Sequence, residues 1–498
     1  MLEYINHTDK VIMSKEKSVK VNALYSFMRA FLKLVFPLIT FPYASRILTP
    51  EGIGQVNFSN SIVSYFNLFA LLGIGTYAER EVARLKDDKI ALSKFVREML
   101  VINLISMTFA YCAFFIIIFF VPKFHSYQTI LLICSTKILF NVVGINWFFY
   151  GVEEFKYTTI RSFFVQCAAI FFLFLAVHSK EDVWLYAIYG VILSTGYDIC
   201  NIIYSRHFID YRVKVKLELK KHIKYIFTFF GMTLVTSIYE MLDTTMIGLI
   251  TDDTQTGYYT AGIKMNNIVL GLLSAVTAVI LPRLSYYNGK GEKEKIEKLK
   301  NKIIRVLILL SIPMTFGLIG LSKPIIILFC GTLYEPAIPI MQIISPIIFI
   351  IGISNLAGAQ FLPAMNKEKV SLASYITGAL VNIISNLILI PRLGAFGAAF
   401  GTVLAETSVM LVQVIYLRKD FFKKEICIDF LHSLIGSIVM FTVIYLIIQN
   451  VSIIILQIIF GFIAGSLTYI LILLLFRNSI FIDYLKLAIN KAKSILHK

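Results

Sequence analysis

The chain has 498 residues, 58% of them hydrophobic and 15% charged, and a formal net charge of +17 at pH 7. Soluble proteins carry roughly a quarter charged residues, so this composition excludes a water-soluble globular protein and places most of the chain in lipid. The basic residues stand in short connections between apolar segments, which favours orientation in a membrane over nucleic-acid binding. The six cysteines are scattered singly, without the spacing of a metal or redox site.

Apolar segments long enough to cross a bilayer, roughly 20 residues each, recur along the whole chain. They predict fourteen helices, at 22–45, 56–78, 99–121, 127–150, 158–178, 183–205, 225–249, 257–281, 303–322, 337–362, 370–391, 394–417, 430–449 and 452–476. The polar start of the chain has no cleavable signal pattern, so the first helix is expected to stay in the mature protein. The expected fold class is an all-α integral membrane protein with 14 transmembrane helices.

The distribution of basic residues predicts the orientation of these helices. Of the 47 Lys and Arg residues, 38 fall in one alternating set of connections and tails, five in the opposite set and four within helices. Since cytoplasmic connections carry the excess, both termini are expected in the cytoplasm. The connections 211–224 and 290–302 are basic enough to lie on an anionic inner leaflet, although a plain solvated loop is the alternative.

Two weak internal matches indicate a duplicated unit. Residues 48–55, after the first helix, have a counterpart at 250–257, after the seventh. The sixth and twelfth helices each carry one acid, Asp198 and Glu406. We therefore expect two six-helix lobes around a central cavity, with helices 13 and 14 and a cytoplasmic tail appended. The expected division is 1–222, 223–424 and 425–498.

Charged side chains near the bilayer centre cost about 2.5–3.5 kcal/mol each on insertion scales, so each one indicates a function or a partner. In the first helix, Arg29 and Lys33 share one stripe with polar side chains. The fourth helix carries Lys137 and Asn141 one turn apart. The second helix presents four polar side chains on one face: Asn57, Asn60, Ser61 and Ser64. We expect an anion-binding site in a hydrated cavity, with the candidates Arg29, Lys33, Lys137, Asn141 and Lys264.

Four acids within the predicted helices are candidates for ion coupling or gating: Glu240, Asp243, Asp198 and Glu406. Glu240 and Asp243 are three residues apart on the seventh helix, so they are expected to titrate as a coupled pair. The alternative is that the four acids and the four bases only pair across the lobes as a static brace. A pair that breaks when substrate binds would act as a gate.

Three segments resemble the Wzx-like oligosaccharide flippases. They are FPYASRILTPEGIGQVNFSNSI (Phe41–Ile62), NWFFYGVEEFKYTTIRS (Asn146–Ser162) and IPRLGAFGAAFGTVLAE (Ile390–Glu406), the last preceded by Asn382 and Asn386. These flippases form the polysaccharide-export branch of the MOP superfamily, which also holds the MATE exporters and the lipid II flippases. Gly394, Gly397 and Gly401 in the last segment would also allow a tight turn and close helix packing.

The resemblance covers nearly the whole chain and implies a function. A protein of this family flips undecaprenyl-pyrophosphate-linked oligosaccharide units across the bacterial inner (cytoplasmic) membrane, by alternating access, for O-antigen or capsule biosynthesis. H⁺ or Na⁺ is the expected coupling ion, and contact with other polysaccharide-assembly proteins is expected. The resemblance implies no enzymatic activity and no cofactor.

Two alternatives remain open. A MATE-like multidrug antiporter has the same fold, but the two appended helices and the cationic first lobe count against it. A polytopic glycan polymerase or ligase would need a sizeable outer loop bearing catalytic Arg or His. Here the outer connections are short, and none of the seven histidines has a plausible carboxylate partner in the sequence.

Overall fold

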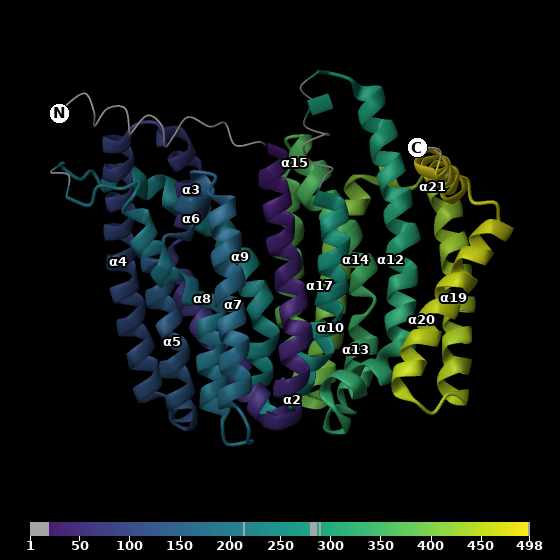
Figure 1. Ribbon diagram of the computed structural model, residues 1–498, viewed down its shortest axis with the longest axis horizontal. Helices are drawn as coiled ribbons and strands as arrows, with labels where there is room; N and C mark the ends of the chain where they lie inside the picture. The colour runs from purple at the N-terminus through teal and green to yellow at the C-terminus, as the bar shows by residue number, and fades with distance from the viewer. Residues whose placement is uncertain (1–18, 213–214, 279–285, 288–289, 497–498) are drawn as a thin grey trace. The chain divides into compact units, whose positions relative to one another are not determined.

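The computed structural model describes residues 19–212, 215–278, 286–287 and 290–496 (Figure 1). Within these ranges every regular element is a helix. Ten of the described helices are long and apolar enough to cross a membrane, or eleven if the bent pair Val35–Leu71 and Ile74–Leu85 is one span. An all-α multi-pass membrane protein is confirmed, whereas the count of fourteen crossings stays a prediction.

The chain divides into two compact units, Met1–Thr245 and Met246–Lys498. The predicted lobe boundaries, 1–222, 223–424 and 425–498, stay predictions. The helices of the first unit are α2 (Val19–Leu71), α3 (Ile74–Leu85), α4 (Lys89–Phe120), α5 (Gln128–Val143), α6 (Asn146–Gly151), α7 (Phe155–Ala176), α8 (Val183–Ser205) and most of α9 (Lys220–Ile250).

The second unit contains α10 (Asp253–Ala278), α12 (Lys293–Cys330), α13 (Ala337–Ile344), α14 (Ile347–Ser354), α15 (Leu362–Ala364), α16 (Glu368–Leu393), α17 (Ala395–Tyr416), α18 (Arg418–Phe421), α19 (Lys424–Asn450), α20 (Ile454–Leu475) and α21 (Ser479–Leu496). A π-helical turn, Asn355–Phe361, joins α14 to α15.

Local backbone chemistry explains where these helices bend. The range of α2 contains the first two predicted helices, which meet at a kink at Thr49, where φ is 63°. Thr49 precedes Pro50, and the residue before a proline is disfavoured in the helical region. The second predicted helix was expected to reach residue 78, but α2 ends at Leu71 because Leu72 and Gly73 both have positive φ. Ile145, with a φ of 39°, separates α5 from α6 in the same way.

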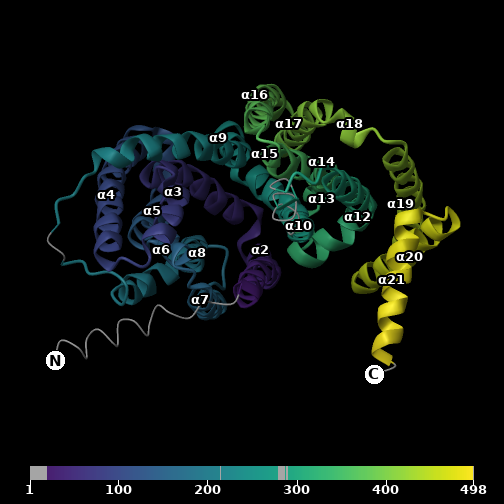
Figure 2. The same ribbon diagram turned by 90° about the horizontal axis from the view of Figure 1, so that it is seen from above.

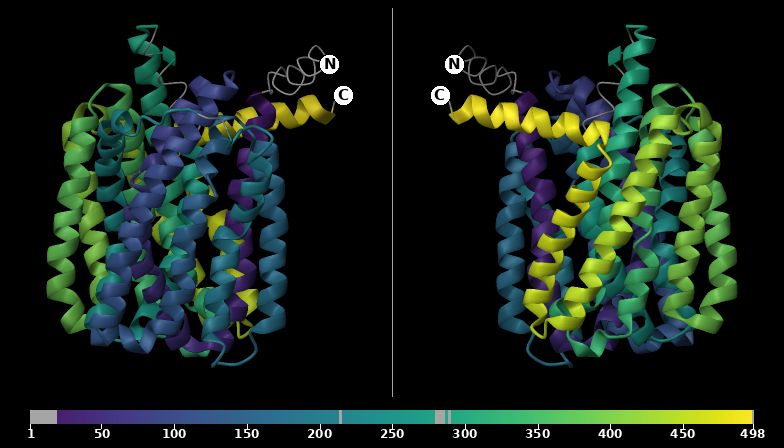
Figure 3. Two further views of the ribbon diagram at one scale, coloured as in Figure 1. Left: turned by 90° about the vertical axis from the view of Figure 1, so that its left-hand side faces the viewer. Right: turned by 90° about the vertical axis from the view of Figure 1, so that its right-hand side faces the viewer.

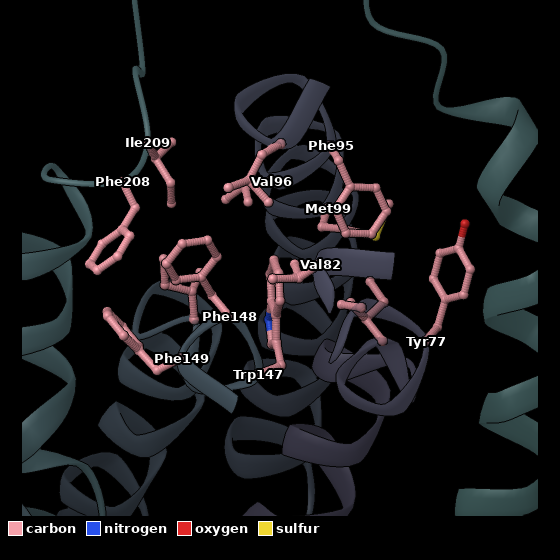
Figure 4. Packing of buried hydrophobic residues seen from close by; sticks show 14 of the residues in the cluster. Tyr77, Val82, Phe95, Val96, Met99, Trp147, Phe148, Phe149, Phe208 and Ile209 are labelled. Atoms are coloured by element: carbon pink, nitrogen blue, oxygen red, sulfur yellow. The ribbon is translucent and has the colours of Figure 1, made fainter. Parts of the chain in front are cut away.

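In the first unit, α2 packs against α4, α5, α7 and α8. One end of this unit is closed by a buried apolar cluster in which α3, α4 and α6 meet (Figure 4). Three of the four aromatic side chains of α6, Trp147, Phe148 and Phe149, are buried there. The short helix α6 is therefore held in place by hydrophobic burial despite being too short to be stable alone.

In the second unit, α16 and α17 form a tight hairpin, seen side by side from above (Figure 2). Gly394 makes the turn with a φ of 57°, a conformation that favours glycine. A Cβ atom on Gly397 would collide with the Leu389 carbonyl, and one on Gly401 with Oδ1 of Asn386. The predicted turn and close packing in this segment are confirmed.

Candidate functional site

The contact between α2 and α5 brings together the polar residues that the sequence placed on their faces. The ammonium of Lys137 donates a hydrogen bond to Oδ1 of Asn60 at 2.6 Å, and Nδ2 of Asn141 donates to Oδ1 of Asn67 at 3.1 Å. Gly190 of α8 leaves room beside this ammonium, since a Cβ there would lie 3.8 Å from Nζ. Within the part of the chain that the structure describes, Lys137 has no carboxylate partner.

A second polar cluster joins α6, α7 and α8. Arg161 donates from Nη2 to Oδ1 of Asn146 at 2.9 Å, and Nδ2 of Asn146 donates to Oδ1 of Asp198 at 2.6 Å. Asn201 donates to the same Asn146 oxygen at 3.0 Å and to the Gly144 carbonyl at 2.6 Å. Asn146 thus links a guanidinium to a carboxylate without direct contact between the two charges.

Aromatic rings and unsatisfied atoms complete this cluster. The guanidinium of Arg161 lies 4.8 Å from the ring centroid of Tyr197 and 5.6 Å from that of Phe149. Four of its buried polar atoms have no hydrogen-bond partner among the described residues: Nε and Nη1 of Arg161, Oδ2 of Asp198 and Oδ1 of Asn201. Buried polar groups are normally paired, so this cluster is suited to hold ordered water.

Arg161 is a residue that the sequence analysis missed. It is not among the candidates predicted there, yet it lies in α7 with 5% of its surface exposed. The available signal was its place in the family-like stretch Asn146–Ser162, which also supplies Asn146 and Phe149. The same stretch contacts the predicted Arg29, whose guanidinium lies 4.8 Å from the ring centroid of Tyr150.

The structure does not unite all of the predicted site residues. Arg29, Lys137 and Asn141 lie in the first unit together with two of the acids, buried Asp198 and buried Asp243. Lys264 on α10 and Glu406 on α17 are half-buried in the second unit, and their relation to the first-unit residues stays a prediction. The side chains of Lys33 and Glu240 lie outside the described residues.

The expectation that no histidine has a carboxylate partner is wrong. Nε2 of His222, at the start of α9, lies 2.8 Å from Oε2 of buried Glu98 on α4, and its Nδ1 lies 2.8 Å from the hydroxyl of Tyr77. The Glu218 backbone N–H donates to Oε1 of Glu98 at 2.7 Å. The two partners are 124 residues apart in sequence, so only the fold brings them together.

This Tyr–His–Glu contact borders a cavity of about 560 Å³ between α3, α4 and α9. Figure 4 shows the Tyr77 hydroxyl pointing away from the apolar cluster that holds its ring. Lys94 and Lys221 lie 4.0 and 3.7 Å from the Glu98 carboxylate. With its oxygens occupied by a histidine, a backbone N–H and two ammonium groups, Glu98 is held as a structural anchor for the start of α9.

In the second unit, ion pairs join the first turns of α12 to residues 420–429. Lys300 lies 3.0 Å from Asp420, Arg305 contacts Asp429, and Lys423 lies 2.7 Å from Glu297. Among the described residues, no group of three or more His, Cys, Asp or Glu side chains is arranged to hold a metal ion.

Comparisons with known proteins agree with this arrangement. Residues 19–288 match the family model described as polysaccharide biosynthesis protein, and residues 229–388 match the MatE model. The chain is 25% identical over 426 residues to the protein named "Putative O-antigen transporter" of Escherichia coli (strain K12), covering 81% of this chain and 97% of that one. It is 23% identical to the capsular polysaccharide biosynthesis protein CapF of Staphylococcus aureus, covering 80% and 99%.

Two solved structures share the fold. The lipid II flippase MurJ in an inward closed conformation matches with a TM-score of 0.72 at 19% identity, over 92% of this chain and 99% of that one. An inward-facing MATE family multidrug transporter of the MOP superfamily matches with a TM-score of 0.60 at 14% identity, over 80% and 97%. The resemblance to the Wzx-like branch of the MOP superfamily is confirmed, and the chain belongs to the polysaccharide biosynthesis protein family.

Proposed function

We propose that the protein flips undecaprenyl-pyrophosphate-linked oligosaccharide units across the bacterial cytoplasmic membrane, by alternating access, for O-antigen or capsule biosynthesis. The observation that carries this proposal is the Lys137–Asn60 contact. A neutral amide satisfies the ammonium as a hydrogen-bond donor but leaves its charge uncancelled, in a span where charge is costly. A pyrophosphate is the anion that such a charge would attract.

The names of the relatives support this choice of cargo. One relative is named for O-antigen transport and another for capsular polysaccharide biosynthesis, and a protein of the same fold is a lipid II flippase. All three names concern glycans or glycan-bearing lipids of the cell envelope. Contact with other polysaccharide-assembly proteins remains part of the proposal.

Substitution of the cations tests the anion site. Lys137→Gln is expected to lower surface polysaccharide per inserted protein at least tenfold, whereas Lys137→Arg retains more function because it keeps the charge. Arg29→Ala and Lys33→Ala are expected to abolish export, and Lys33→Arg to exceed Lys33→Gln. The matched control is Lys86→Gln, which removes a half-exposed lysine beside Glu153. Normal export by both Lys137→Gln and Lys33→Gln would contradict the proposal.

Ion coupling is proposed for the acid pair on α9. Glu240 and Asp243 would share protons in coupled steps, or bind Na⁺, while the protein alternates between its two states. In reconstituted vesicles, Glu240→Gln is expected to uncouple flipping from an imposed pH or Na⁺ gradient while substrate still binds. If Glu240→Gln and Asp243→Asn both keep gradient-driven flipping, Asp198 and Glu406 become the candidates.

The proposed orientation places both termini in the cytoplasm. Reporter fusions at Lys220 and Lys298 are expected to read cytoplasmic, and fusions at Asp253 and Asn450 external. These four positions lie in different connections of the predicted fourteen-helix topology. An external reading at Lys298 would contradict the proposed lobe arrangement.

The MatE match over residues 229–388 makes multidrug export the second candidate. Many exported drugs are cations, and the uncancelled charge of Lys137 disfavours them in the first unit. A strain lacking the protein would separate the two functions. Loss of surface polysaccharide with unchanged resistance to cationic dyes supports the flippase.

A further inference from the structure

The C-terminal helix α21 is fixed to the second unit by a buried polar contact at its first turn. Asn478 caps the helix by accepting a hydrogen bond from the Phe481 N–H at 3.1 Å, and it donates to Oδ1 of Asp429 at 2.6 Å. Arg305 of α12 contacts the same Asp429 and donates from Nη2 to Oγ of Ser479 at 2.7 Å. This network fixes the direction in which α21 leaves α20.

That direction takes α21 across the ends of its neighbours instead of alongside them (Figure 3). Ile480 is buried against the unit, whereas Leu485 and Leu487 are 38% and 60% exposed. Lysines alternate with these apolar residues, at 486, 491 and 493. A helix of this composition at the end of membrane spans is typical of one that lies in the lipid headgroup region.

Between α12 and α21 lies a cavity of about 230 Å³, lined by Lys298, Asn301, Lys302, Arg305, Asp483 and Tyr484 among others. The ammonium of Lys302 lies 4.9 Å from the ring centroid of Tyr484. Lys298 is paired with Glu294, but both side chains are more than three-quarters exposed, and such pairs exchange partners at little cost. Two lysines are thus available to an anion at the mouth of the cavity.

The cavity also offers an unused hydrogen-bond acceptor. The Nδ2 group of Asn301 donates to Glu425 at 3.0 Å. Its Oδ1 atom is buried and accepts no hydrogen bond from the described residues. A buried acceptor without a donor costs free energy, so a ligand with a hydroxyl group would be favoured over one without. Arg305, which also lines the cavity, is occupied by Asp429 and Ser479.

We propose that this cavity binds the headgroup of an anionic phospholipid that carries a free hydroxyl, of the phosphatidylglycerol type. The phosphate lies between Lys298 and Lys302, the headgroup hydroxyl donates to Asn301, and the acyl chains follow the exposed leucines of α21. Basic pockets at the cytoplasmic ends of spans suit such headgroups. The site is separate from the proposed transport pathway and does not depend on which lipid-linked glycan is carried.

Binding of defined lipids to the purified full-length protein tests the proposal, by native mass spectrometry with phosphatidylglycerol and phosphatidylmethanol. Both lipids are anionic phosphodiesters, but only the first has a headgroup hydroxyl. Wild type should prefer phosphatidylglycerol, and Asn301→Ala should remove that preference. Lys302→Gln should weaken binding of both lipids about tenfold, as expected for loss of a charge-assisted contact. The matched control is Lys295→Gln, an exposed lysine of α12 outside the cavity.

The melting temperature of each of the three variants is measured in lipid-free detergent. A melting temperature equal to that of wild type would show that the variant remains folded. Equal binding of the two lipids by wild type would overturn the hydroxyl contact. Equal lipid binding by Lys302→Gln and Lys295→Gln would overturn the site. Competition by soluble glycerol phosphate at the lipid's own concentration would identify a soluble anion as the ligand instead of a lipid.

Discussion

The two units treat their cations differently. In the first unit, Lys137 and Arg161 contact the amide oxygens of Asn60 and Asn146 within the spans. In the second, Lys300 contacts the carboxylate of Asp420 near the start of α12. An amide oxygen satisfies a donor and leaves the positive charge in place, whereas a carboxylate also cancels it. The first unit therefore keeps positive charge inside its spans, and the second uses charge to join helix ends.

The kind of partner that a cation has depends on where the cation lies along its helix, and not only on the unit. The first unit also has a carboxylate-paired cation at a helix start, where Lys94 lies 3.1 Å from Glu218. Exposed pairs of this kind contribute little to stability. What distinguishes the first unit is that its interior cations Lys137 and Arg161 donate to amide oxygens and not to carboxylates.

The largest effect is expected when the interior of the first unit loses a cation. Arg161→Ala removes one of the two donors to Oδ1 of Asn146 and the cation–π contacts with the rings of Tyr197 and Phe149, which should lower stability by about 3–5 kcal/mol. The apparent melting temperature of the purified protein in detergent measures this. The control is Arg84→Ala, whose 70%-exposed side chain pairs with Glu81. Equal melting of the two variants would mean that the contacts of the Arg161 guanidinium do not stabilise the unit.

A smaller effect is expected from the close packing of the second unit. Gly401→Ala places a Cβ against Oδ1 of Asn386, and overpacking of this kind costs about 1–3 kcal/mol. Gly75→Ala, with no neighbouring atom within 4 Å, is the control. The same melting measurement applies. If Gly401→Ala is as stable as the control, α16 and α17 can move apart without loss of stability. Close packing of this hairpin would then not stabilise the second unit.

A double-mutant cycle on Lys300 and Asp420 measures the ion pairing of the second unit directly. The side chains are 9% and 19% exposed, between the surface and buried limits, so we expect a coupling free energy of about 1–2 kcal/mol. The single and double alanine variants are compared by melting temperature. If the effects of the two substitutions on stability are additive, the coupling free energy between Lys300 and Asp420 is zero. A carboxylate partner would then stabilise a cation no more than an amide does.

The smallest effect concerns pH at the surface of the first unit. Hydrogen bonds from Lys94 and Lys221 hold the pKa of the Glu218 carboxyl below its usual range. A lowered folded-state pKa means that the contribution to stability is present above the ordinary pKa of about 4.3 and is lost as the pH falls through the lowered value. Wild type should therefore melt slightly above Glu218→Gln at pH 7, and the two should converge in acid. If the difference in melting temperature between wild type and Glu218→Gln persists in acid, the Glu218 carboxylate is not its cause.

Much of the helical architecture could be predicted from the sequence, because lipid forces long apolar segments into helices. The helix expected at 183–205 matches α8 at both ends. Spacing on a helix also predicted which polar side chains share a face, such as Lys137 with Asn141. That Lys137 meets Asn60 is known only from the structure. The break between the first two predicted helices was also predictable, since the kink at Thr49 lies in the connection expected between residues 45 and 56.

The missed residues share a physical reason. Arg161 lies in the second turn of α7, close to a charged connection, and the sequence does not show that its side chain is buried. Glu98 and His222 are adjacent only because α4 and α9 converge, and helical periodicity contains no information on that convergence. The sequence therefore predicted which polar residues share a helix face. It did not predict the tertiary contacts between single polar residues of different helices.

The kinked segment 46–55 of α2, where two helices meet at Thr49, has a practical consequence for labelling this protein. Leu48 and Ile53 are buried there, and the backbone is helical except at Thr49. An epitope tag or protease site inserted in this turn would have to displace buried side chains, whereas residues 178–181, between α7 and α8, are all exposed. Insertions succeed mainly at exposed polar turns. The connection at 178–181 is therefore the better position for an affinity handle or a fluorophore.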